Sequence, residues 1–237
     1  MRNTFFAAFA LFCVPASIGT GARTGIVCMV VLAGLYWLQS RRKLLSGFAV
    51  SVFGVLLLFF APERWKDRMA TIDDYSEESS ALTRIKMWQW ILDYARDNPM
   101  GGGFRAFEVS VIQMPATAEH PDSYIQRGRA AHSAWFETLN ELGWPGLFLL
   151  LTLIVVTFAT LYRVMQRTKG IEKLLWCRDL ARALGMALLV LMAGGSFIGV
   201  AFQPWFWLFF AVSFCLGEYV RRVLAPVKPL PGYLPAS

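Results

Sequence analysis

Residues 144–162 read WPGLFLLLTLIVVTFATLY, and this stretch decides the fold. It contains no aspartate, glutamate, lysine or arginine. A helix of about 20 mostly apolar residues crosses the roughly 30 Å hydrocarbon layer of a lipid bilayer. The 19 residues of this run come close to that length, so the sequence predicts a transmembrane helix here.

Further apolar runs lie on both sides of this stretch, and the whole chain has the composition of a membrane protein. Hydrophobic residues make up 56% and charged residues 16% of the 237 residues, and the mean hydropathy is +0.47. The further runs extend over residues 4–18, 24–39, 44–61, 183–200 and 203–220. The first run is short and follows Arg2, so it also fits a signal peptide. We favour a span, because the glycines and Arg23 that follow predict a tight exterior turn.

The basic residues predict the orientation of these helices. The net charge is +7, but lysine and arginine are grouped in short segments beside the apolar runs, at 41–43, 163–182 and from 221 onward. This grouping lacks the continuous basic surface that binds nucleic acid, so nucleic acid is not an expected partner. Connectors rich in lysine and arginine face the cytoplasm. Residues 62–143, with nine basic and thirteen acidic residues, are therefore expected on the periplasmic side.

The expected fold class is all-α, a polytopic transmembrane bundle of about six spans with one large periplasmic loop that holds two or more helices. The predicted domains are N-terminal spans at 1–61, the periplasmic loop at 62–143, C-terminal spans at 144–222 and a cytoplasmic tail at 223–237. Membrane lipid then surrounds most of the chain. The four cysteines lie outside the loop and form no metal-binding pattern, so neither a disulfide, a metal ion nor a cofactor is expected.

Two helices are predicted inside the loop. Serine at position 79 or 80 can cap the first, which runs to about Asn98 and stops before a proline. Its apolar face is expected to hold Ala81, Ile85, Trp88, Ile91, Leu92 and Ala95. A glycine turn at 101–103 and a stretch of low order follow, and the second helix extends from about Ser133 to Gly143.

Arg84 is the exception on the first loop helix, because it falls in the apolar sector that the other charged residues avoid. In one interpretation its aliphatic stem covers apolar surface while the guanidinium reaches water. In the other interpretation Arg84 points into a cavity and binds an anion, since guanidinium donates hydrogen bonds to phosphate in a planar fork. Position alone favours neither.

Arg23 and the two histidines, His120 and His132, are the other candidates for chemistry. Arg23 follows Gly21 at the outer end of an apolar run, and it is either an interfacial anchor or a phosphate contact. His132 directly precedes the second loop helix, whose N-terminus disfavours an imidazolium. A neutral imidazole can accept a proton from a hydroxyl group, so His132 is either a base or a structural histidine at a helix start.

Five short motifs follow one another along the chain: Gly-Ala-Arg-Thr-Gly at 21–25, Arg84-x-x-x-Trp88, Asn98-Pro99-x-Gly-Gly-Gly, Ala131-His132-Ser133 and Glu141-x-Gly143-x-x-Gly146. In this order they resemble the O-antigen ligase superfamily of bacterial membrane glycosyltransferases, from about Ile18 to Gly146. Within that superfamily, Gly-Gly-Gly-Phe-Arg and Ala-His-Ser-x-x-Phe-Glu look most like the O-glycosylation ligases associated with exosortase systems.

The resemblance implies an inverting, metal-independent glycosyltransferase of the GT-C type in the bacterial inner membrane, with a role in cell-envelope polysaccharide biosynthesis. Such an enzyme takes a glycan from an undecaprenyl diphosphate carrier on the periplasmic side and passes it to an acceptor hydroxyl on a lipid or protein. A polysaccharide polymerase of the same superfamily is an alternative, and a non-catalytic transport or scaffold subunit is another. A transporter is expected to place polar groups at midspan, which the runs at 44–61 and 144–162 lack.

The resemblance also implies roles for single residues. Arg23 and Arg84 would hold the diphosphate, and His132 would act as the base or position the acceptor. The expected substrate-binding residues are Arg105, Gly102, Gly103 and Trp88. Members usually carry further spans before the Arg23 motif. The chain is therefore expected to be a fragment, to have a misplaced start codon, or to need a partner chain that supplies those spans.

Overall fold

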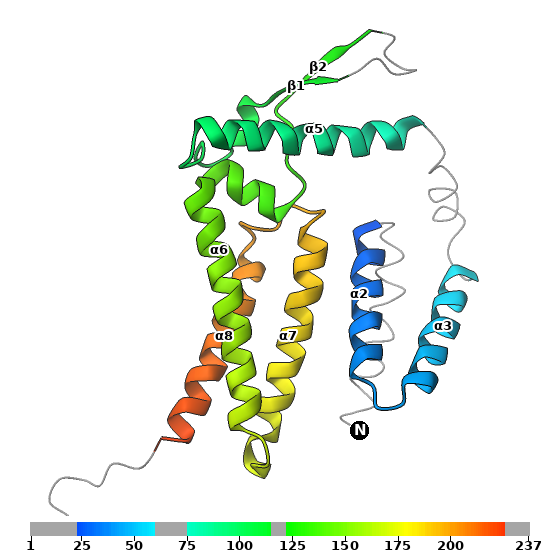
Figure 1. Ribbon diagram of the computed structural model, residues 1–237, viewed down its shortest axis with the longest axis vertical. Coiled ribbons are helices and arrows are strands. Elements are labelled where there is room, and N and C mark those ends of the chain that lie inside the picture. The colour runs from blue at the N-terminus through cyan, green and yellow to red at the C-terminus, as the bar shows by residue number, and fades with distance from the viewer. Residues whose placement is uncertain (1–22, 60–74, 115–121, 226–237) are drawn as a thin grey trace, which may run out of the picture. The chain divides into compact units, whose positions relative to one another are not determined.

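The computed structural model describes residues 23–59, 75–114 and 122–225 (Figure 1). The predicted run at 4–18, His120 and nearly all of the predicted tail lie outside these ranges. Most of the described residues are helical, as expected for an all-α fold. The chain forms two compact units, one of residues up to 151 with 186–203, the other of residues 152–185 with those from 204 onward.

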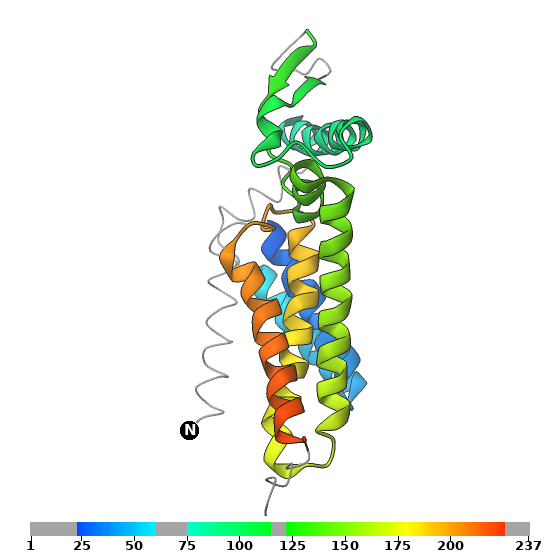
Figure 2. The same cartoon turned by 90° about the vertical axis from the view of Figure 1, so that its left-hand side faces the viewer.

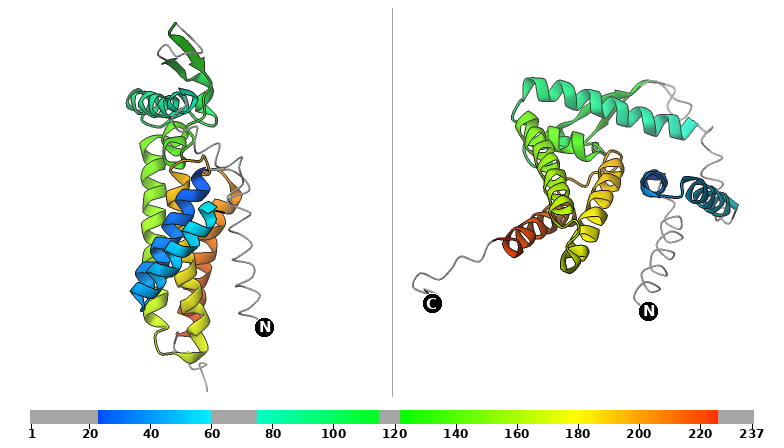
Figure 3. Two further views of the ribbon diagram at one scale, coloured as in Figure 1. Left: turned by 90° about the vertical axis from the view of Figure 1, so that its right-hand side faces the viewer. Right: turned by 60° about the horizontal axis from the view of Figure 1, so that its bottom comes forward.

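Helices α2 (Arg23–Gln39) and α3 (Lys43–Phe59) pair in the first unit and lie side by side in Figure 3. Their short connection is closed by Trp37, whose Nε1 donates a hydrogen bond to the backbone oxygen of Lys43 at 3.0 Å. The Lys43 ammonium group donates to the backbone oxygen of Leu38 and lies 5.1 Å from the centre of the Trp37 ring. Both helices agree with the predicted runs at 24–39 and 44–61.

Helix α5 (Tyr75–Asp97) is the first loop helix, and it ends before Pro99 as predicted. Its buried side chains are Met87, Ile91 and Ala95, which are four residues apart and so form one stripe. The predicted apolar face does not coincide with this stripe. It included Ile85, which is 47% exposed. The predicted cap was also wrong, since the helix begins ahead of positions 79 and 80.

An antiparallel hairpin of β1 (Val111–Met114) and β2 (Tyr124–Arg127) packs on α5. Figure 2 shows the hairpin and the start of α6 on opposite sides of α5. Ile112 and Met114 are buried against Met87 and Ile91, because successive side chains of a strand point to opposite faces. The prediction of a stretch of low order was therefore wrong for both strands.

Helix α6 (Ala134–Arg167) begins as the second loop helix and is interrupted at Gly143, as the sequence predicted. Gly143 has φ 65° and ψ −164°, a conformation essentially restricted to glycine. A Cβ atom at this position would overlap the backbone oxygen of Pro99. The backbone of Trp144 donates to that same oxygen at 3.0 Å. This close approach holds the segment after α5 against the kink of α6 at Gly143.

The second unit contains the rest of α6, a short 3-10 turn (Glu172–Leu174), the first half of α7 (Leu175–Gly195) and helix α8 (Pro204–Val223). Its core consists of Leu161, Val164, Leu174, Cys177, Ala181, Leu216 and Val220. Cys177 is fully buried among these apolar side chains, where a free cysteine packs as a small apolar residue.

Among the described residues, one helix is long and apolar enough to cross a membrane, Ala134–Arg167. It contains the run at 144–162 from which the membrane class was inferred. Thr24–Gln39 and Lys43–Val52 are shorter apolar helices. Helix α7 ends at Gly195, so the predicted run at 183–200 extends beyond it into a turn. The bundle of about six spans and the four predicted domains remain predictions.

Candidate functional site

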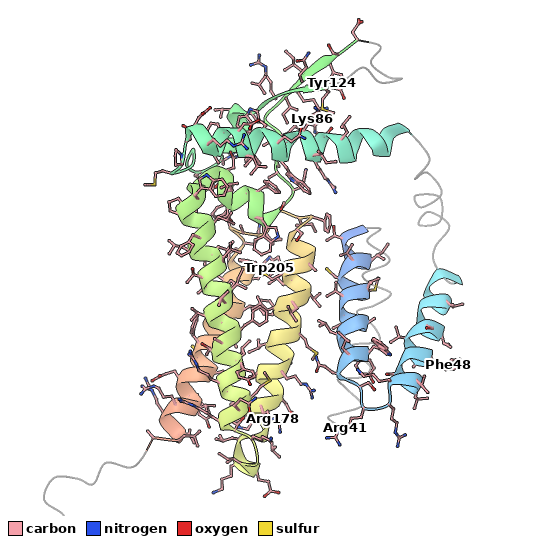
Figure 4. The ribbon with its side chains drawn as sticks, viewed as in Figure 1. Arg41, Phe48, Lys86, Tyr124, Arg178 and Trp205 are labelled. Carbon is pink, nitrogen blue, oxygen red and sulfur yellow. The ribbon has the colours of Figure 1, made fainter. Side chains whose placement is uncertain are left out.

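A cavity of about 230 Å³ lies where α5, β2 and the segment before α6 meet. Its lining comprises Thr83, Arg84, Tyr124, Gln126, Arg129, Ala130 and His132. Tyr124, on the hairpin, is labelled in Figure 4. We call this space the basic cavity, because its described lining contains two arginines and no carboxylate. The structure thus brings together two of the three predicted catalytic residues, Arg84 and His132.

Arg84 occupies a half-buried position on α5, one turn before Trp88. Within the described part of the chain, neither Arg84 nor Arg129 forms an ion pair with a carboxylate. Arg129 Nε donates to Gln126 Oε1 at 3.1 Å, and its backbone amide donates to Ser110 Oγ at 3.1 Å. A guanidinium with no carboxylate partner keeps its charge available to an anion.

Trp88 fixes the segment that carries His132. Its Nε1 donates to the backbone oxygen of Ala131 at 2.8 Å. Its ring stacks on Phe136 with the centroids 4.9 Å apart and an angle of 4° between the planes. Trp88 therefore supports the cavity from outside its lining, and the predicted role of this residue in substrate binding stays a prediction.

His132 is held in a left-handed backbone conformation, with φ 48°. Residues other than glycine seldom adopt positive φ, and such conformations cluster at functional sites. Loss of solvation is the main cause that lowers the pKa of His132 below 6.5, and the positive charges of Arg84 and Arg129 lower it further. The imidazole is therefore predominantly neutral at neutral pH, as the sequence predicted.

The predicted cause of this neutrality, the N-terminus of the second loop helix, stays a prediction. Ser133 precedes the first residue of α6, but its buried hydroxyl has no hydrogen-bond partner among the described residues. A partial loss of solvation and two arginines lower the pKa of His132, although the residue as a whole remains exposed to solvent. One of them, Arg129, was not singled out from the sequence.

A second cavity, also of about 230 Å³, adjoins the first. Its lining comprises Phe107, Ala130, Ala131, His132, Glu137, Asn140, Glu141, Ile198 and Gly199. We call it the acidic cavity, because its described lining contains two glutamates and neither lysine nor arginine. Ala130 and His132 line both cavities, so the histidine stands between a positive and a negative surface.

The two glutamates of the acidic cavity are spaced i, i+4 on α6, which places them on the same helix face. Burial is the main cause that raises the pKa of Glu137, and the charge of Glu141 raises it further, while the Ala201 amide lowers it. That amide donates to Glu137 Oε2 at 3.2 Å. Burial also raises the pKa of Glu141, and the backbone amide of Arg105 acts in the opposite direction.

The glycine turn lies against α6 through its backbone. The amide of Gly102 donates to the Asn140 carbonyl at 2.9 Å, and the amide of Gly103 donates to the Glu141 carbonyl at 3.0 Å. The side chain of Arg105 pairs with Glu108 at 2.5 Å on the surface. None of these three predicted substrate-binding residues lines the basic cavity, and their roles stay predictions.

Arg23 begins helix α2, and the structure describes nothing of its side chain. Its predicted contact with diphosphate therefore also stays a prediction. The sequence did not single out Arg129, Gln126 or Asn140, and it placed Glu137 and Glu141 in motifs without assigning them a role. The spacing of the two glutamates was a usable signal, because like charges at i, i+4 destabilise an isolated helix and therefore call for another reason.

In a comparison with known protein families, the sequence model of the O-antigen ligase family matches residues 5–151. This range includes α2, α3, α5, the hairpin and the first part of α6. It also includes both arginines of the basic cavity and both glutamates of the acidic cavity. No curated protein matched the chain, and no solved structure did.

Proposed function

The chain belongs to the O-antigen ligase family, and we propose that it transfers a glycan from an undecaprenyl-diphosphate-linked donor to an acceptor hydroxyl at the periplasmic face of the membrane. Proteins of this family are integral to the inner membrane and carry out glycosyl transfer of the ligase or polymerase type. They act on a lipid-linked glycan and an acceptor. The proposal concerns the donor, the face of the membrane and the residues that act.

The basic cavity is the observation that carries the proposal. Two arginines that have no carboxylate partner among the described residues flank a neutral histidine in one small space. Arginine binds a diphosphate through paired, charge-assisted hydrogen bonds. The same contacts stabilise the charge that develops as the diphosphate leaves. We assign this role to Arg84 and Arg129, with Arg23 as a further candidate.

The reaction is a substitution at the anomeric carbon of the sugar attached to the diphosphate. The acceptor oxygen forms the new bond from one face while the bond to the diphosphate oxygen breaks on the other, so the configuration is inverted. His132 accepts the hydroxyl proton of the acceptor, which a neutral imidazole can do. The arginines supply the positive charge, and the proposed reaction therefore requires no metal ion and no cofactor.

The orientation in the membrane forms part of the proposal. The basic connectors support a topology of about six spans with residues 62–143 in the periplasm. A cysteine that replaces the exposed Ser123 should react with an impermeant maleimide in cells with a permeabilised outer membrane, and one that replaces the exposed Lys169 should not. Thr168 is unsuitable for this experiment, because it is completely buried. The reverse pattern would place the candidate site in the cytoplasm.

The identity of the acceptor is the most specific part of the proposal. The motifs Gly-Gly-Gly-Phe-Arg and Ala-His-Ser-x-x-Phe-Glu favour the exosortase-associated ligases, which would pass the glycan to a protein. Membranes that contain the chain and a labelled lipid-linked glycan can be supplied with candidate lipid or protein acceptors. Label on a protein supports this subtype, and label on a growing polysaccharide would make the chain a polymerase.

The test of the whole proposal is transfer of that label with arginine variants. Arg129→Ala should abolish most transfer, while Arg127→Ala, a matched change two residues away on β2 and outside the cavity lining, should leave it intact. A chelator added to the same membranes should have no effect. Equal transfer by both variants at equal expression would remove the basic cavity from the reaction.

A further inference from the structure

We propose that a cavity in the second unit binds an anionic phospholipid, with two arginines on the phosphate and apolar side chains along the acyl chains. The cavity has a volume of about 510 Å³ and lies between the C-terminal parts of α6 and α8. We call it the larger cavity. Its lining comprises Thr160, Arg163, Val164, Arg167, Phe214, Gly217, Glu218, Val220 and Arg221. The inference requires only that the chain lies in a membrane, as members of its family do.

The lining of the larger cavity changes from apolar to charged along both helices. Figures 1 and 2 show that α6 and α8 end on the same side of the second unit. The lining runs on α6 from Thr160 to Arg167, a rise of about 10 Å, and on α8 from Phe214 to Arg221. Each helix therefore places arginine near its end and a less polar side chain further in. This order suits an amphipathic ligand, because a free phosphate would leave the apolar part uncovered.

Arg163 and Arg167 carry the charge that attracts the phosphate. They are spaced i, i+4 on one face of α6, where two like charges destabilise a helix and an anion between them offsets the repulsion. Among the described residues, neither forms an ion pair with a carboxylate. Glu218 pairs instead with Arg221 and Arg222, at 2.6 Å in each case. Two neighbouring guanidinium groups can donate to the oxygens of one phosphate.

The apolar part of the cavity lies where the two helices approach each other. A Cβ atom at Gly217 would lie 2.6 Å from the Thr160 methyl carbon, so small residues bring α6 and α8 close together here. Phe214 lines the cavity one turn before Gly217 and is 37% exposed, which leaves ring surface for an acyl chain. The volume falls within the roughly 300–1,000 Å³ of ligand pockets. The cavity therefore suits a headgroup and the first carbons of its chains.

Aromatic side chains mark the headgroup level at this end of the unit. The ring centroids of Trp176 and Tyr219 lie 5.4 Å apart, and both residues are exposed. Tyr162, next to Arg163, is exposed as well. Tryptophan and tyrosine gather where a membrane meets water. Basic pockets between membrane helices bind phospholipid headgroups, and the neighbouring aromatic residues place Arg163 at the depth of the phosphates.

Photoreactive phosphatidylglycerol tests the inference on the purified full chain. The reactive group is on the acyl chain, and cross-linked peptides are identified by mass spectrometry. Phosphatidylglycerol should label the peptides of the larger cavity about tenfold more than phosphatidylcholine with the same chains, because the second headgroup adds a cation that the arginines repel. Glycerol phosphate, which has the phosphate but no acyl chains, should not reduce this labelling.

Arg163→Gln combined with Arg167→Gln should lower labelling by phosphatidylglycerol to the level of phosphatidylcholine. The matched control is Arg178→Gln with Arg182→Gln, an exposed pair of the same spacing on α7 and outside the lining; Arg178 is labelled in Figure 4. This control should leave labelling intact.

Three results would overturn the inference. Equal loss in both double variants would mean that general attraction to a basic surface holds the lipid. Equal labelling by the two lipids would remove the preference for an anion, and competition by glycerol phosphate would reduce the cavity to a phosphate site. The measured quantity is lipid binding and not glycan transfer, so failure of the proposed function leaves this test unaffected.

Discussion

Two cavities of this protein are lined by arginines, and they differ in what accompanies the positive charge. In the second unit a cavity of about 510 Å³ is lined by Arg163, Arg167 and Arg221 together with Glu218. Glu218 occupies the donors of Arg221 at 2.6 and 2.7 Å. In the basic cavity of the first unit, Gln126 is the partner of Arg129, and a neutral histidine takes the place of the carboxylate.

The volume of a cavity is therefore a poor guide to the candidate site in this protein. The larger cavity carries its own anion, and its described lining contains no histidine. The smaller cavity has two arginines with no described carboxylate partner and one proton acceptor. We therefore propose that Arg163, Arg167 and Arg221 help to orient the chain in the membrane. We propose that Arg84 and Arg129 bind the donor diphosphate.

The largest expected effect is at His132. His132→Ala should lower the rate of glycan transfer by about 10²–10⁴-fold, the usual contribution of a general base, while donor binding survives. His120→Ala is the matched control, since His120 lies outside every motif, and it should change little. Rates and donor binding are measured in membranes with equal expression. Lost donor binding in His132→Ala would instead make the histidine a phosphate ligand.

The second-largest expected effect is the loss of glycan transfer at Arg84, which distinguishes the arginines of the basic cavity from those of the second unit. Arg84→Ala should lower transfer by about 10²–10³-fold, the typical loss for one group that stabilises a developing negative charge. Arg84→Lys should fail almost as badly, because an ammonium group offers no planar fork. Arg163→Ala in the second unit should leave transfer nearly unchanged. An active Arg84→Lys variant would reduce Arg84 to general electrostatics, and an active Arg84→Ala variant would return it to the surface-covering interpretation.

A smaller effect concerns stability. Gly143 and Gly170 both have positive φ, but only Gly143 has backbone atoms in the space of an added Cβ. Gly170→Ala should lower the free energy of unfolding by about 1–2 kcal/mol, because alanine is strained at a positive φ. Gly143→Ala should lower the free energy of unfolding by clearly more, because the backbone at Pro99 must also move. Thermal unfolding of the purified variants measures both, and equal losses would mean that α5 and α6 are not fastened at this point.

The smallest effect is a shift in pH dependence. The pKa of His132 is lowered below 6.5, so transfer should fall as the pH drops through that lowered value, where the base becomes protonated. Arg129→Gln removes one of the charges that lower the pKa, so in the small transfer activity that remains the acidic limb should move to higher pH, toward 6.5. The same change at Arg127 should not move it. A limb that stays in place with Arg129→Gln would assign the titration to another group.

The sequence predicted those parts of the site that depend on local pattern. The helix from Ser133 to Gly143 was found because glycine readily ends a helix. Arg84 stood out because it interrupts an apolar sector, and the structure places it in a cavity beside His132. Both inferences use residues that lie close together in the sequence.

The parts that were missed depend on contacts between distant segments. Arg129 reaches the cavity because β2 pairs with β1 on top of α5, and four-residue strands are too short to give a clear alternation. The acidic cavity depends on Gly199 and Ile198, which follow α7 and are far from Glu137 in sequence. No pattern within a single helix could have joined these segments.

The most direct test of the central claim is capture of the donor by the two groups of arginines. A photoreactive undecaprenyl diphosphate can be cross-linked in membranes to the unaltered chain, to Arg84→Ala combined with Arg129→Ala, and to Arg163→Ala combined with Arg167→Ala. If Arg84 and Arg129 bind the donor, the first pair of changes abolishes specific cross-linking and the second pair leaves it intact. Cross-linking that survives the first pair and is lost with the second would contradict the account, because the donor would then bind at the larger cavity.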